Sequence, residues 1–102
     1  MKKEQLFNSL LQVVSEECEI TAEEILSTNR SVDVVDARHI LVKCLSECGM
    51  YVADMARLTG LSVRSINHIL CEFDNRIRYG HYMRNNYARV RQRISNNHFG
   101  EQ

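Results

Sequence analysis

The sequence predicts an all-α protein, a compact bundle of about six helices that contains a helix-turn-helix. The 102 residues contain no proline and only four glycines, so few positions interrupt a helix. Apolar residues recur at helical spacing, and possible caps and glycine stops separate the segments. The length is that of one domain, which we expect over residues 1–95, followed by a flexible tail, residues 96–102.

The first two helices are expected before residue 28. A second helix begins after Thr21, an N-cap with Glu24 three residues later, as a capping box requires, and should end near residue 26 or 27. Residues 27–29 then open a loop. The first helix is expected over residues 4–15, and its apolar face consists of Leu6, Phe7, Leu10, Leu11 and Val14.

The third helix can be capped by Ser31 or Asp33 and should reach about residue 48, with Gly49 as its stop. Arg38 falls on its apolar side and needs a carboxylate, a carbonyl or a ligand phosphate; pairing with an acid such as Asp54 and a phosphate contact are both open. The helical wheel places Val34, Ala37, Leu41, Cys44, Leu45 and Cys48 on the buried face and Asp36, His39, Lys43 and Glu47 outside.

A helix-turn-helix is predicted between residues 52 and 73. Ala56 is a small residue where two helices can approach, Gly60 tolerates a positive φ in the turn, and Ile66 closes the corner. Ser62 can cap the second helix. The alternative is an ordinary helical corner in a bundle. The two helices should span about residues 52–58 and 63–79, Gly80 interrupts, and a last helix covers about residues 81–94; Met55, Leu61, Val63 and Ile69 should complete the shared core.

The second helix of this pair is the candidate recognition helix, whose N-terminal part would lie in the major groove of DNA. Arg64 can form two hydrogen bonds to guanine, and Asn67 can contact adenine. Ser65 and His68 suit base edges or phosphates.

Charge is distributed unequally although its sum is zero. Residues 1–49 carry five basic and nine acidic side chains, whereas residues 50–102 carry eight basic and four acidic ones. Residues 75–100 contain six arginines and no acid. Such asymmetry favours contact with nucleic acid, and the alternative is a solvated helix face.

Residues 25–40 (ILSTNRSVDVVDARHI) resemble the C-terminal DNA-binding domain, domain IV, of the bacterial replication initiator DnaA, a helix-turn-helix of the Trp-repressor-like superfamily. That domain carries a run of the form leucine-serine-x-x-arginine-serine, then valine-x-x-alanine-arginine. The order of elements is also similar, so the resemblance extends over about residues 5–93. It implies that Arg30, in a basic loop, enters the minor groove, and that Arg38 and His39 lie near phosphates. We also expect phosphate contacts from Ser62 and Arg76.

The chain departs from this family in its recognition helix. The family has a five-residue run there: aspartate, histidine, serine or threonine, threonine, and valine. Residues 62–66 of this chain are SVRSI, and the turn is one residue shorter. We therefore do not expect it to bind the usual initiator box. A Gly-rich phosphate loop followed by lysine is also missing from the sequence, so ATP-driven origin melting is not expected.

The leading prediction is a stand-alone, sequence-specific binder of double-stranded DNA that acts in replication control or transcription by occupying a site. The alternative is a protein-interaction module on the same fold, with a protein partner for the arginine-rich last helix. We expect no catalytic residue, cofactor, small-molecule substrate or membrane contact, and a cytoplasmic location, because no signal peptide or spanning segment is visible. The cysteines should be reduced thiols, and a metal site of Cys44, Cys48, His68 and Cys71 is disfavoured because the two pairs face differently.

Overall fold

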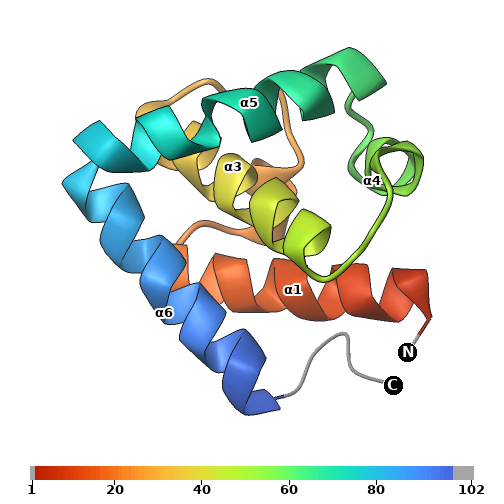
Figure 1. Ribbon diagram of the computed structural model, residues 1–102, viewed down its shortest axis with the longest axis horizontal. Helices are drawn as coiled ribbons and strands as arrows, with labels where there is room; N and C mark the ends of the chain where they lie inside the picture. Colours follow the sequence, from red (N-terminus) through yellow and green to blue (C-terminus); the bar gives the residue numbers. More distant parts are fainter. Residues whose placement is uncertain (1, 98–102) are drawn as a thin grey trace.

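Helix α3 (Val32–Glu47) lies at the centre of the structure and packs against all five other helices (Figure 1). The structure is a computed structural model that describes residues 2–97, which contain helices and no strand. The predicted all-α bundle of about six helices is therefore confirmed. The other helices are α1 (Lys3–Cys18), α2 (Ala22–Ile25), α4 (Val52–Thr59), α5 (Val63–Tyr79) and α6 (His81–Asn97).

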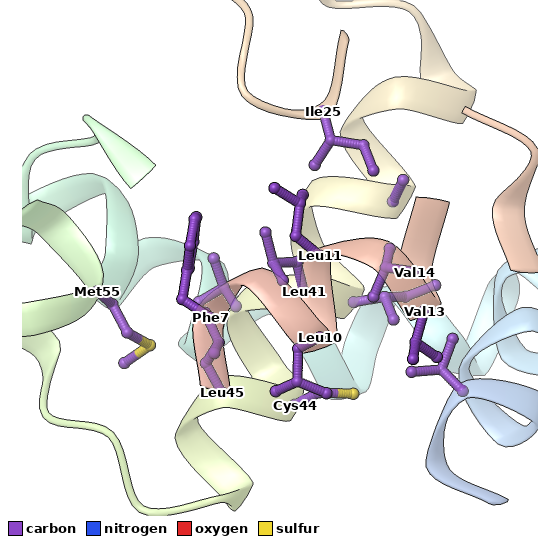
Figure 2. Close-up of a cluster of buried hydrophobic side chains, with 14 of the residues drawn as sticks. Phe7, Leu10, Leu11, Val13, Val14, Ile25, Leu41, Cys44, Leu45 and Met55 are labelled. Atoms are coloured by element: carbon purple, nitrogen blue, oxygen red, sulfur yellow. The ribbon is translucent and has the colours of Figure 1, made fainter. Parts of the chain in front are cut away.

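The core forms mainly between α1 and α3. Leu10 and Val14 of α1 are fully buried, as are Leu41 and Leu45 of α3, and Figure 2 shows these side chains gathered between the two helices. All five apolar residues predicted for the buried face of α1 are buried. Val13 is buried as well, because α6 packs against α1 on a second side.

Local capping follows the sequence closely. The Thr21 hydroxyl accepts a hydrogen bond from the Glu24 N–H (3.1 Å), and the helix that it caps ends at Ile25, slightly earlier than predicted. Ser31 stands at the N-cap position of α3 without a side-chain capping bond. Gly49 follows the end of α3 with φ of 93°, a left-handed conformation that favours glycine.

The turn between α4 and α5 has the predicted chemistry. Gly60 ends α4 with φ of 80°, and its N–H donates to the Ala56 carbonyl (2.9 Å). The Ser62 hydroxyl accepts from the Ser65 N–H (3.0 Å) and caps α5. The prediction that Val63 joins the shared core is wrong: its side chain is 48% exposed, because it opens α5 before the segment whose Ile66, Ile69 and Phe73 are buried.

His39 is the main error on α3. The wheel placed it outside, but its side chain is only 7% exposed, and Ile40 and Val42 are also buried. A wheel assigns one buried face to each helix, whereas α3 is covered on several sides by its five neighbours.

Gly80 separates α5 from α6, as predicted. A Cβ at this position would lie 2.8 Å from the Arg76 carbonyl oxygen, so only glycine fits without a shift. Helix α6 continues to Asn97, beyond the predicted end at 94 and into the predicted tail, because no helix-breaking residue stops it. Residues 98–102 of that tail lie outside the described residues. None of the helices within residues 2–97 combines the length and apolar character needed to cross a membrane.

Candidate nucleic-acid interface

The loop between α2 and α3 is held in place by Arg38. Its Nε donates to the Ile25 carbonyl (2.8 Å), and its Nη2 donates to the carbonyls of Ser27 (2.7 Å) and Asn29 (3.1 Å). The half-buried arginine has therefore found carbonyl partners, and the considered pairing with Asp54 is wrong. Asp54 instead pairs with Lys3 (3.0 Å) on α1, across the bundle. Arg38 thus fixes the shape of the loop from the side of α3.

Short polar side chains complete the loop. The Ser27 hydroxyl donates to the Glu24 carbonyl (2.6 Å) and accepts from the Asn29 N–H (3.1 Å). The Asn29 side-chain oxygen in turn accepts from the Ser31 N–H (2.8 Å). These bonds turn the backbone around Arg30, whose side chain is exposed. Arg30 is the one charged residue of loop residues 26–31.

The first two turns of α5 present an exposed polar row. Arg64, Ser65, Asn67 and His68 are all exposed, while Ile66 and Ile69 on the opposite side of these turns are buried. No acidic residue occurs in the first turn, and the first acid of the helix is Glu72. The positive end of the helix dipole is therefore not offset by a carboxylate of the same turn.

The loop and α5 meet in one groove with a volume of about 530 Å³. The residues that line it come from the loop, the first half of α3, the turn before α5 and α5 itself, and the loop and α5 are distant in the sequence. None of its lining residues is acidic. Seven predicted contact residues are among them: Arg30, Arg38, His39, Arg64, Ser65, His68 and Arg76. Asn67 and Ser62 lie outside the groove, Asn67 exposed on α5 and Ser62 in its cap.

His39 lies at the inner wall of the groove. Its Nδ1 is 2.8 Å from the Val35 carbonyl, which can only accept, so Nδ1 carries the proton of the neutral ring. Burial lowers the pKa of His39 and outweighs the hydrogen bond to the Val35 carbonyl, which raises it; the repulsion of Arg76 lowers it further, so the ring is neutral near pH 7. Its Nε2 then presents a lone pair, and this geometry does not favour the predicted phosphate contact of His39.

Arg76 is shared between the groove and the fold. Its Nη2 and Nε donate to one carboxylate oxygen of Asp36, at 2.9 and 3.3 Å. The partner lies 40 residues away and on another helix, so the sequence offered no signal for this pair. Because Asp36 already offsets its charge, Arg76 attracts an anion less than Arg64 or Arg30 does.

Three of the four arginines of α6 have a different role. Arg89 pairs with Glu17 (3.2 Å), and Arg93 pairs with Glu16 (2.9 Å) and Glu17 (3.1 Å) of α1. Arg91 lies 3.8 Å from Glu47 of α3. The acidic first half and the basic second half of the sequence therefore offset each other here within the fold.

The cysteines and histidines do not assemble. Cys44 is buried on α3 and Cys48, directly after that helix, is half-buried, whereas His68 and Cys71 are exposed on α5. Within residues 2–97 no three His, Cys, Asp or Glu side chains are grouped as a metal site would require. All four cysteines are free, and burial raises the pKa of Cys18 to about 11.

Comparison with known proteins adds no relative. No protein-family model, curated protein or solved structure matches this chain. The resemblance of residues 25–40 to the replication initiator therefore stays a prediction from the sequence.

Proposed function

We propose that this chain binds double-stranded DNA in a sequence-specific manner, through the groove and the exposed row of α5. The observation that carries the proposal is the groove: four arginines and no acid line it in a protein whose net charge is zero. Phosphates supply much of the affinity of a protein for DNA, and a basic surface next to the N-terminus of a helix that has no acid in its first turn fits them.

In this proposal the first two turns of α5 enter the major groove. Arg64 has the length and exposure to contact guanine, and Asn67 to contact adenine. Ser65 and His68 contact base edges or phosphates. The Ser62 hydroxyl donates to the Ser65 hydroxyl (3.0 Å), so both hydroxyls are held at the start of the helix.

Arg30 is the proposed minor-groove contact. It is exposed in a loop whose backbone is fixed by Arg38, so its position relative to α5 is set before DNA arrives. Arg38 acts mainly by holding this loop, with Nη1 left to face a phosphate, since no residue within 2–97 accepts a hydrogen bond from that atom. The resemblance of residues 25–40 to the initiator domain supports the same arrangement.

The proposed role is occupancy of a DNA site in replication control or transcription, in the cytoplasm and without a cofactor or catalytic step. Fluorescence titration of mixed-sequence duplex at 50 and 200 mM salt tests the binding itself. Each phosphate contact should steepen the log–log salt dependence by about 0.9. Selection from a random duplex pool then gives the target sequence. No binding at 50 mM salt would contradict the proposal.

A protein-interaction module is the second candidate, and the ion pairs of α6 favour it. Because Arg89 and Arg93 are bound to carboxylates of α1, the basic surface is smaller than the sequence indicates. Failure to bind any duplex at low salt would leave this candidate in place of the first.

A further inference from the structure

A second hollow, of about 380 Å³, lies between the end of α1, the first half of α3 and the start of α6. We call it the acidic hollow; it is lined by Glu19, Ile20, Asp33, Asp36, Tyr82 and Asn86, together with Cys18 and Ala37. It shares no lining residue with the groove. Whatever binds in one hollow therefore need not displace a molecule bound in the other.

Exposed apolar side chains surround the acidic hollow. Tyr82, on its rim, is 74% exposed. Val32 and Tyr79 are 69% and 78% exposed and line an adjoining hollow, which meets the first at Asp36. Half of the large hydrophobic side chains that residues 2–97 expose thus gather at this one corner of the bundle. Tyrosine at the surface is typical of protein contacts, because its ring is large and loses little conformational freedom on binding.

The charge of this corner is negative. Glu19 and Asp33 form no ion pair within residues 2–97, whereas Asp36 is bound by Arg76. No basic residue lines the acidic hollow. This charge repels DNA and favours a cationic group, the reverse of the groove.

Asn86 adds a donor to the acidic hollow. Its side chain is only 6% exposed, and its Oδ1 accepts from Arg89. Its amide nitrogen has no hydrogen-bond partner within the described residues and is not fully enclosed. A carbonyl oxygen of an incoming chain would satisfy it.

We propose that the acidic hollow docks a segment of a protein partner that carries an arginine or lysine next to an apolar side chain. The cation lies between Glu19 and Asp33 and against the ring of Tyr82, as cation–π contact favours. The apolar side chain covers Ile20, and a backbone carbonyl of the segment accepts from Asn86. The partner is thus basic at this site, opposite in sign to the acidic partner that the arginines of the last helix would suggest.

The test is a titration of the ¹⁵N-labelled full chain with the blocked peptide Ala-Leu-Arg-Leu-Ala, and with the same peptide carrying glutamine in place of arginine. We expect saturable shifts that gather at Ile20, Tyr82 and Asn86, and binding of the glutamine peptide that is weaker by at least about threefold. Tyr82→Ala, and separately Glu19→Gln combined with Asp33→Asn, should weaken the arginine peptide by about threefold to tenfold.

Glu23→Gln is the matched control, because it removes one exposed charge outside the acidic hollow and should change nothing. Tyr82→Ala removes a largely exposed ring, so this variant keeps the fold and its DNA affinity and decides the matter even if the double variant is unstable. Unsaturable shifts, shifts centred on Arg64 and Ser65, or an equal loss in the Glu23 variant would overturn the proposal.

Discussion

Two regions of this molecule are rich in arginine, and they differ in whether their arginines have carboxylate partners within the fold. On α6, Arg89, Arg91 and Arg93 face carboxylates of α1 and α3. In the groove, Arg30 and Arg64 have no carboxylate within 4.0 Å among the described residues. Four of the six arginines in the denser run, residues 75–100, are thus ion-paired within the fold. A cluster of charged residues in a sequence indicates a ligand of opposite charge only once their ion-pair partners within the fold are known.

The largest effect should come from removing both free groove arginines. Arg30→Ala with Arg64→Ala should weaken binding to a selected duplex by about a hundredfold, since a good base contact contributes about 1–3 kcal/mol of discrimination. Arg64→Ala alone should reduce the preference for the selected over a random duplex, whereas Arg30→Ala should weaken both. Arg91→Ala on α6, also an exposed arginine, is the control and should bind as the parent does. Equal losses for all of these variants would erase the distinction between the two regions.

Arg38→Ala should be next, and it should act on stability as well as on DNA. Three carbonyls of the loop lose their donor, which we expect to cost about 2 kcal/mol in the free energy of unfolding. Urea denaturation measures this cost, and hydrogen exchange should show faster exchange confined to residues 26–31. Arg38→Lys should not restore the loop, because one ammonium cannot reproduce the planar fork. Unchanged exchange in the loop would mean that Arg38 does not hold it.

Arg93→Ala tests the other arm of the comparison. Its ion pairs with Glu16 and Glu17 are at the surface, so the Tm should fall by about 4 °C or less, and by less still in high salt. DNA affinity should remain unchanged. A loss of DNA affinity without a change in Tm would place α6 at the interface and overturn the division drawn here.

The smallest effect concerns His39, at the inner wall of the groove, and the dependence of stability on pH. Burial depresses the pKa of His39 in the folded chain below the 6.5 of an unfolded one, so unfolding takes up a proton at acidic pH. Stability from this residue is full above pH 6.5 and is lost as the pH falls through the folded pKa. His39→Gln should therefore flatten the dependence of Tm on pH between 7 and 5. An unchanged slope would mean that other titratable groups cause the dependence of Tm on pH.

Local chemistry made part of this structure predictable. Thr21, Gly60 and Ser62 each form a hydrogen bond with a residue no more than four positions away. Both partners of each bond can therefore be recognised within a short stretch of sequence. The bond of Arg89 to Glu17 joins residues 72 apart, and that of Arg76 to Asp36 joins residues 40 apart. No spacing rule reaches so far, which is why the ion pairs of α6 were not predicted. His39 was misplaced for a related reason, since the covering of α3 from several sides is a property of the whole bundle.

The Arg38 hydrogen bonds also affect the rate of DNA association and the conformational entropy that is lost in it. A loop that is already ordered in the free chain loses little conformational entropy when DNA arrives. Association should then resemble the docking of two rigid bodies, with a rate that follows ionic strength and shows no slow conformational step. Calorimetry should find a heat-capacity change no larger than the buried surface explains, because no segment folds on binding. The order of loop residues 26–31 in the free chain would thus be measurable as a smaller loss of conformational entropy on DNA binding.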